Sequence, residues 1–332
     1  MVTKKGWLQS LAMSLFTQES AGGVAKYGEA IEMSDANACS MKSFEFNPEW
    51  GDEPVTDREE VSGTEHGTTQ EIIEQRVNMT YSEPKAKPNS VIGIMALVLG
   101  KITSSGSTDG YKHLVVPVQH GDALPSIQVE HLKGGIQYKY NGVKGNSVTL
   151  SGEAGGLVNL EANLMGSGAR AVSAAAFPAA ITESWIKLNQ MKIWMESGAK
   201  IAVNPAVLAQ GTESISSDTP TSLDVRFKNF TFTYNNNLEP IPGAGGAGLL
   251  LDADFGRRSI ELSFQLLFGS QTDLDLYINQ SPVAVEFDFK GAETAASSGI
   301  FYGFKLILPN IRLSAVPMPE GGPDDILTCT FN

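Results

Sequence analysis

Apolar and polar residues alternate with a period of two along much of the chain, which predicts β-strands with one buried and one wet side. In residues 69–81, for example, Val77 and Met79 share one side of the strand, and Asn78 and Thr80 share the other. The pattern therefore predicts a mainly β fold. The further strands that it predicts are residues 42–47, 114–118, 127–132, 136–140, 148–151, 158–164, 226–234, 260–266, 283–289, 304–313 and 326–331.

A few segments break this alternation. Residues 91–99 contain Ala, Met and Leu, and we predict a helix there with Asn89 or Ser90 as its N-cap. Residues 273–278 are a second, shorter candidate helix. The dipeptide Asn141-Gly142 predicts a tight turn that joins two separate strands.

The amino-acid composition agrees with many short strands joined by turns. Charged residues make up only 18% of the chain, and it contains 34 glycines and 16 prolines. Acidic residues outnumber basic ones 37 to 24, which gives a net charge of −13. Wrapping of nucleic acid needs a basic surface, so this charge argues against it. An acidic wall that repels DNA is useful where DNA must slide past without sticking.

The two halves of the sequence share an order of predicted parts. Each half opens with Lys-x-Phe-x-Phe, at residues 42–46 and 228–232, and then gives a loop, an alternating strand and a possible helix. Each closes with a turn that holds a glutamate and two glycines, at residues 153–156 and 320–322. The alternative is chance similarity between two β-domains. The predicted division is an N-terminal arm (1–35), a first domain (36–170), a connecting segment (171–221) and a second domain (222–332).

Two β-domains in tandem leave sheet edges that need partners, and a barrel built from several chains satisfies every edge. The wet sides of the long strands then face either an aqueous lumen or ordinary solvent. The candidate lumen-facing residues are Glu74, Asn78, Glu161, Glu261, Gln265, Glu286 and Asp288.

Over about residues 30–332 the sequence resembles the tail tube proteins of long-tailed bacteriophages, especially the long versions in which the tube domain is duplicated. The resemblance rests on residues 124–130 and 138–151, on the turn at 155–156, and on residues 307–311. It implies two tandem tail-tube-type β-sandwich or barrel domains, each with a flanking helix, whose strands join those of neighbours in an inner barrel. The segments that depart from the pattern, the long polar loop 51–67 and the Ala-rich insert 166–220, are expected at ring-to-ring contacts or on the tube exterior.

The same resemblance implies a structural virion protein, made in the host cytoplasm and located in the tail. Its implied partners are further copies of itself, in trimeric pseudo-sixfold or alternatively hexameric rings that stack into a tube, and the tape measure, tail terminator and distal tail proteins. DNA is expected to pass through without specific binding. The competing hypotheses are a tail fibre adhesin or capsid decoration protein and, less favoured, a β-rich virion-associated hydrolase.

Residues that carry chemistry do not form a recognisable motif. The four histidines, His66, His113, His120 and His131, lack metal-binding spacing, and we expect them at the surface or in interfaces. Cys39 lies far from Cys329 in the sequence, as is usual for buried thiols without a metal or redox role. We therefore predict no metal, no cofactor and no enzymatic activity.

Two further features bear on the hydrolase hypothesis and on location. Pairs of carboxylates such as Asp252/Asp254 and Asp273/Asp275 suit a glycosidase, although this spacing is more typical of turns. We identify no signal peptide at the N-terminus. The most apolar run, residues 91–99, is about half the roughly 20 residues that span a bilayer, so we predict no membrane anchor.

Overall fold

The computed structural model is mainly β, as the sequence predicts. It describes residues 9–14, 38–41, 45–50, 53–56, 70–107, 110–119, 122–173, 176–179, 183–197, 221–222, 226–242, 249–267, 275, 279, 281–293, 301–315 and 326–331.

We call strands β1 to β12 the first half and strands β13 to β22 the second half. The first half comprises β1 (Gln9–Ser14), β2 (Ala38–Met41), β3 (Glu45–Trp50), β4 (Glu53–Thr56), β5 (Gln70–Glu74), β6 (Val77–Glu83), helix α1 (Pro88–Leu99), β7 (Gly100–Ser107), β8 (Gly110–Pro117), β9 (Ile127–Lys133), β10 (Ile136–Glu153), β11 (Asn159–Gly166) and β12 (Arg170–Ser173). The short 3₁₀-helix η2 (Leu188–Gln190) leads into the second half. That half comprises β13 (Met191–Ser197), β14 (Thr221–Ser222), β15 (Phe227–Asn235), β16 (Leu238–Pro242), β17 (Leu250–Phe255), β18 (Ser259–Leu267), β19 (Val283–Glu293), β20 (Phe301–Ile311), β21 (Leu313–Ala315) and β22 (Ile326–Phe331).

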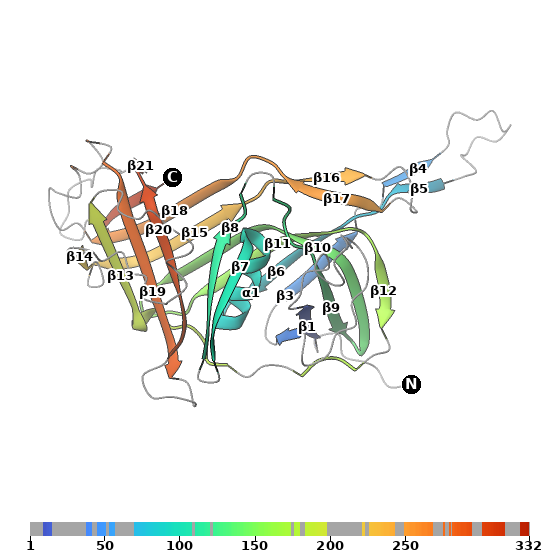
Figure 1. Cartoon of the computed structure of the whole chain (residues 1–332), viewed down its shortest axis with the longest axis horizontal. Coiled ribbons are helices and arrows are strands. Elements are labelled where there is room, and N and C mark those ends of the chain that lie inside the picture. Colours follow the sequence, from blue (N-terminus) through green and yellow to red (C-terminus); the bar gives the residue numbers. More distant parts are fainter. Residues whose placement is uncertain are drawn as a thin grey trace.

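One curled sheet runs through both halves in the order β3-β6-β11-β10-β15-β18-β22-β21, and we call it the long sheet (Figure 1). Two smaller sheets accompany it. The first small sheet is β2-β1-β9-β10-β12, and the second small sheet is β14-β13-β19-β20. The halves are joined edge to edge, because β10 pairs with β15 from Ser147↔Asn235 to Glu153↔Asn229.

Strand β10 belongs to both the long sheet and the first small sheet. The sequence prediction of a tight turn at Asn141-Gly142 is wrong, because β10 continues through this dipeptide. Gly142 has a φ of 61°, and the pairing register with β9 shifts between Tyr140 and Val143. A glycine at a β-bulge lets a strand bend and change partners. The dipeptide therefore redirects one strand where the sequence suggested the end of a hairpin.

Helix α1 confirms the predicted helix, but its start differs from the expectation. Its N-cap is Lys87 without a side-chain hydrogen bond, and Pro88 occupies the first turn, where the fixed φ of proline suits a helix and its missing N–H is no loss. The helix ends at Gly100, whose φ of 94° allows the left-handed C-terminal conformation. The expected capping role of Asn89 or Ser90 is therefore wrong.

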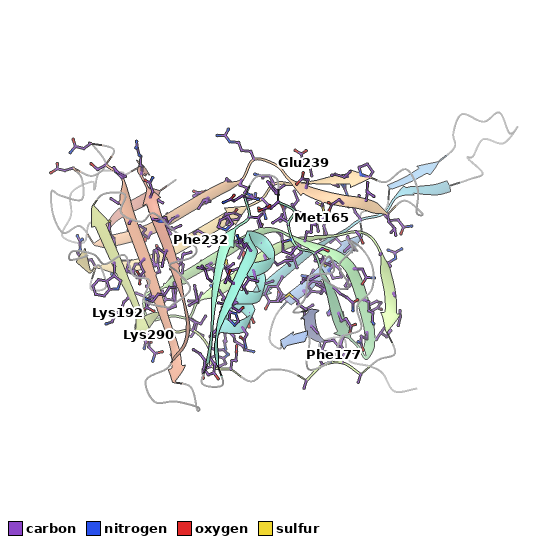
Figure 2. The ribbon with its side chains drawn as sticks, in the orientation of Figure 1. Met165, Phe177, Lys192, Phe232, Glu239 and Lys290 are labelled. Atoms are coloured by element: carbon purple, nitrogen blue, oxygen red, sulfur yellow. The ribbon has the colours of Figure 1, made fainter. Side chains whose placement is uncertain are left out.

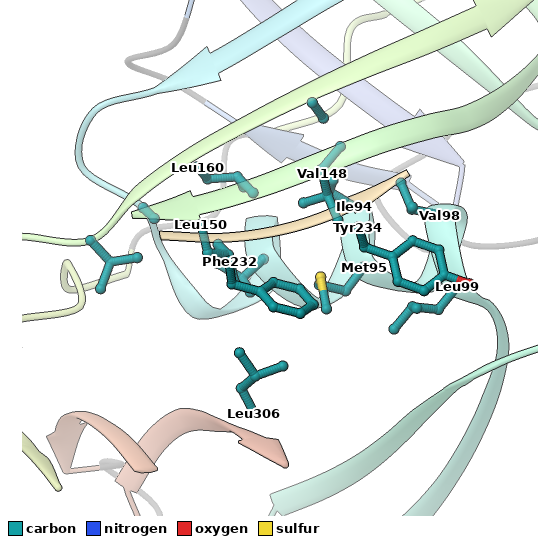
Figure 3. Packing of buried hydrophobic residues seen from close by; sticks show 14 of the residues in the cluster. Ile94, Met95, Val98, Leu99, Val148, Leu150, Leu160, Phe232, Tyr234 and Leu306 are labelled. Carbon is teal, nitrogen blue, oxygen red and sulfur yellow. The ribbon is translucent and has the colours of Figure 1, made fainter. Parts of the chain in front are cut away.

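The main hydrophobic core lies between α1, the long sheet and the second small sheet. Val148 and Leu150 of β10, Phe232 and Tyr234 of β15 and the apolar side of α1 meet there (Figure 3). Leu306 of β20 approaches the same cluster from the second small sheet. The junction of the halves is thus buried in a shared core.

The second half repeats the pairing order of the first. β3 pairs with β6 and β6 with β11, as β15 pairs with β18 and β18 with β22. β1 pairs with β9 and β9 with β10, as β13 pairs with β19 and β19 with β20. The hairpins β4–β5 and β16–β17 occupy the same place in their halves, between the two strands of the first pair.

A pair of aromatic rings recurs at the same position of each half. The rings of Phe46 and His131 lie 4.9 Å apart edge to face, and those of Phe230 and Phe287 lie 5.3 Å apart. His131 is 1% exposed, so the expected surface position is wrong for this histidine. Burial, with a smaller contribution from Lys133, lowers the pKa of His131 to about 4. The ring is therefore neutral at neutral pH.

Most other strand predictions are confirmed. The structure also has strands that the sequence did not predict, among them β7, β13, β16 and β17, and it divides the expected strand 69–81 into β5 and β6. Residues 9–14 form strand β1 inside the expected arm. Strand β3 continues through Pro48, which an edge strand tolerates, and β4 occupies residues 53–56 of the expected loop. Of the short predicted helix, only Asp275 lies among the described residues, where it is helical and its carbonyl accepts a hydrogen bond from the Asn279 amide at 3.0 Å.

Candidate functional site

One side of the long sheet is lined by small polar side chains and glutamates, and we call it the polar face. Its other side is the apolar face that packs on α1. The residues whose register positions place them on the polar face are Glu45, Asn47, Glu49, Asn78, Thr80, Ser82, Ser147, Thr149, Ser151, Asn159, Glu161, Asn163, Asn229, Thr231, Thr233, Asn235, Ser259, Glu261, Ser263 and Gln265.

Strand alternation and register together bring these residues into rows that cross both halves. One row runs Glu161, Thr149, Thr233 and Glu261 across β11, β10, β15 and β18. Neighbouring strands lie about 4.8 Å apart, so the two glutamates of this row stand about 14 Å apart. The acidic side chains are thus spaced by hydroxyl groups.

Hydrogen bonds between neighbouring strands tie the polar side chains together. The Asn163 side-chain amide donates to Ser147 Oγ at 2.9 Å, and the Asn229 amide donates to Gln265 Oε1 at 2.8 Å. At the junction of the halves, Thr149 Oγ1 lies 3.3 Å from Thr233 Oγ1. These bonds satisfy part of the polar face internally and hold its side chains in place.

The charge of the polar face is acidic. None of the residues placed on it above is basic, whereas it holds Glu45, Glu49, Glu161 and Glu261. Lys144, in the middle of β10, aligns with Asn78 through Met165, but it is 2% exposed and its Nζ donates to Asp252 of the β16–β17 hairpin. Among the residues placed on the face there is therefore no exposed cation, although the exposed Lys85 lines the hollow at one end of it.

The structure brings four of the predicted lumen-facing residues together on the polar face: Asn78, Glu161, Glu261 and Gln265. Glu74 lies at the end of β5, in the β4–β5 hairpin. Glu286 and Asp288 lie on β19, in the second small sheet.

Glu286 and Asp288 differ from the residues of the polar face in their surroundings. Glu286 is 1% exposed and accepts a hydrogen bond from Lys305 Nζ at 3.1 Å. Asp288 stands between Lys192 and Lys305 in the strand register, and Lys290 follows on β19 (Figure 2). The sequence expectation of a shared wet side does not hold for Glu286, because its side chain is buried and bonded to Lys305.

Sequence reasoning missed the serine, threonine and asparagine residues that make up most of the polar face. A signal was present in the strand 226–234, where Thr231 and Thr233 alternate with Phe230 and Phe232. Only the pairing of β10 with β15 shows that this strand continues the same face as Thr149.

The long sheet ends in two strands that are each paired on one side by a described strand. β3 pairs with β6, and β21 pairs with β22. Between them the sheet is continuous. Among the described strands, each of the two end strands therefore has one edge without a partner, where a further strand can pair.

An open hollow of about 660 Å³ lies at one end of the polar face. Strands from both halves line it, through residues such as Ser151, Asn159, Thr231 and Gln265. Glu153 is the one carboxylate among its lining residues, whereas a glycosidase needs two. Asp252, a member of a predicted carboxylate pair, is bonded to Lys144.

The described residues contain no group of three or more His, Cys, Asp or Glu side chains that could hold a metal ion. No described helix has the length and hydropathy that crossing a membrane requires.

Comparison with known proteins identifies a family. The family model described as phage tail tube protein matches residues 88–332, which is more than half of the chain. No curated protein sequence matches the chain. The matched region starts at α1 and includes all of the second half.

Proposed function

The chain belongs to the phage tail tube protein family, and from this premise we propose that it is the major tube subunit, which stacks in rings around a channel for DNA. Membership makes it a structural component of the phage tail that assembles with itself into a tube. The proposal adds the identity of the subunit, the lining of its channel and the number of copies in a ring.

The observation that carries this proposal is the long sheet. It is curled, its polar face is acidic with no cation among the residues of its rows, and among the described strands its end strands β3 and β21 are paired on one side. Copies joined from β21 to β3 close such sheets into a barrel whose inside is the polar face. Asn78, Glu161, Glu261 and Gln265 then line the channel.

The junction of β10 with β15 supports the way in which copies join. It links the first half to the second by antiparallel pairing over seven residue pairs. In the contact between two copies, β21 of one copy takes the place of β10, and β3 of the next copy takes the place of β15, as the repeated pairing order indicates. The contact between copies then imitates the contact within the chain, and three duplicated copies form a ring of six similar units.

The acidic lining suits passive passage of DNA. Like charges keep the duplex away from the wall, and no lysine or arginine of the face is available for release of counterions. The ends of such a tube are the expected places for the tape measure, terminator and distal tail proteins.

Electron microscopy of the purified full chain tests the assembly. We expect long hollow tubes whose averaged rings contain three copies with six similar lobes. Rings of six copies contradict the duplication. Discrete trimers that never stack indicate an adhesin or decoration protein, and monomers that release sugar from cell-wall material indicate a hydrolase.

Cysteine labelling tests which face lines the channel. Thr231 is exposed on the polar face, and we expect Thr231→Cys to react with a small maleimide in the assembled tube but not with a maleimide coupled to a large protein. In the unassembled chain both reagents react. The unmodified sequence gives the background from Cys39 and Cys329. Equal reaction with both reagents in the tube contradicts the luminal position.

A further inference from the structure

The two hairpins of the chain have matching connections but different surroundings. Two residues separate β3 from β4, and two separate β15 from β16. At the base of each hairpin, the first residue of the first strand pairs with the last residue of the second strand. These pairs are Glu53↔Glu74 and Leu238↔Phe255. They are therefore corresponding arms of the two halves.

The β16–β17 hairpin lies across the end of the first half. Leu238 packs with Val118 and Leu124, and the Leu238 amide donates to Asn146 Oδ1 at 2.8 Å. Lys144 Nζ donates to Asp252 Oδ1 at 2.5 Å and to the Ala253 carbonyl at 3.1 Å.

The base and the tip of this hairpin are also held. At its base, the side-chain amide of Asn236 donates to the carbonyls of Val98 and Gly145, at 2.7 and 2.9 Å. Near its tip, Leu249 forms a β-bridge with Gln75, which follows β5 at the base of the β4–β5 hairpin. This hairpin is thus an anchored clamp on the neighbouring half.

The β4–β5 hairpin extends away from the body of the chain (Figure 1). Among the described strands, β4 and β5 pair only with each other. The β16–β17 hairpin lies on the half that is next to its own half in the long sheet. The β4–β5 hairpin has no such neighbouring half in the described sheet, because β3 is the end strand. The corresponding surface for this arm is therefore the second half of another copy.

The register identifies Arg312 as the residue that corresponds to Lys144. Lys144 follows Val143, which closes the β10 bulge opposite Ile127. Arg312 follows Ile311, which closes the equivalent β20 bulge opposite Val283. Position along the hairpin strands matches Glu71 to Asp252, because each stands three residues before the strand end, at Glu74 and Phe255. A register shift beside Glu53 places Glu71 opposite the third residue of β4, whereas Asp252 lies opposite the fourth residue of β16.

Corresponding residues of the two halves have the same chemical character but different exposure. Lys144 is buried under its hairpin, whereas Arg312 is exposed. Val77 at the start of β6 is 1% exposed, whereas Ile260 at the start of β18 is 42% exposed. The end of the second half therefore presents a cation and an apolar side chain, whereas the corresponding end of the first half is covered.

We propose that the β4–β5 hairpin of each copy lies across the second half of the neighbouring copy, with Glu71 bonded to the neighbour's Arg312. The inference rests on the proposed self-assembly and adds its contact residues. Repeated around a ring, the arms form an unbroken belt in which each hairpin tip meets the base of the next.

Charge reversal tests the link. We expect Glu71→Arg and Arg312→Glu each to raise the protein concentration needed for tubes by about tenfold or more, because each places like charges in a desolvated contact. The double variant restores assembly. Glu239→Arg is the matched control, because Glu239 is an exposed acid on the other hairpin, and it is expected to assemble normally.

Thermal unfolding of the unassembled variants shows whether each one folds. As an independent measurement, Glu71→Cys with Arg312→Cys should give a disulfide ladder between chains that stops at the number of copies in a ring. Normal assembly of both single reversals, or a ladder equal to that of Glu239→Cys with Arg312→Cys, overturns the inference and leaves the tube proposal standing. Failure of the unmodified chain to assemble overturns both.

Discussion

The two halves of the molecule share a pairing order, but among the described residues they differ in how their last strand and their end are covered. Strand β10 is paired on both sides, by β11 and β15, whereas β21 is paired by β22. The end of the first half is covered by the β16–β17 hairpin, whereas Arg312 and Ile260 at the end of the second half are exposed. In the proposed assembly, this difference marks the end of the second half as the place where a neighbouring copy binds.

The largest expected effect compares the closed junction with the open end. Phe232 is 2% exposed in the core that joins the halves, so Phe232→Ala should lower the free energy of unfolding of the unassembled chain by about 3–5 kcal/mol. Ile260→Ala should lower it by about 1 kcal/mol or less, since Ile260 is 42% exposed. Denaturant unfolding measures both. Equal losses would show that the junction is no better packed than the open end.

A smaller effect separates the halves by pH. The pKa of His131 is about 4 in the folded chain and 6.5 in the unfolded chain, so below pH 6.5 the unfolded state binds a proton that the folded state does not. Stability should therefore fall between pH 6.5 and 4, by up to about 3 kcal/mol. The corresponding residue of the second half is Phe287, which does not titrate. His131→Phe should remove this part of the pH dependence, which denaturant unfolding at pH 7, 5.5 and 4.5 measures. If the free energy of unfolding falls with pH as steeply in the variant as in the unmodified chain, the prediction is wrong.

The smallest effect compares the corresponding cations. Lys144→Met removes a buried bond to Asp252 and should cost the unassembled chain about 1–2 kcal/mol. Arg312→Met should change the stability of the unassembled chain by about 0.5 kcal/mol or less, because Arg312 is exposed there. Its loss should instead weaken tube formation in a sedimentation assay. A loss of chain stability with Arg312→Met would place its contacts within one copy.

The sequence predicted the strands and helix α1 because their signals are local. The alternation of Asn78 and Thr80 with Val77 and Met79 shows directly in their burial. The course of β10 was not predictable, because Asn141-Gly142 suits both a hairpin turn and a bulge, and the partners β9, β11, β12 and β15 decide between them. Residues 53–56 read as a loop because Pro54 and the acids lack strand character, although pairing with β5 makes them a strand.

The candidate site was partly predictable for the same reason. The alternation of apolar and polar residues was enough to predict Glu161, Glu261, Asn78 and Gln265, which share the polar face. It also selected Glu286, whose burial depends on strands that lie far away in sequence. The hydroxyl and amide residues were not selected, because Ser and Thr on a wet side are ordinary until register aligns them from strand to strand.

The hydrogen bonds along the polar face bear on friction. Asn163 already donates to Ser147, and Asn229 donates to Gln265. These groups therefore gain little by exchanging a partner for a passing phosphate or its water. Side chains that are already hydrogen-bonded to each other offer shallower energy wells to a moving duplex than side chains with free donors. In the proposed tube, the resistance to sliding then comes mainly from the water layer between wall and duplex.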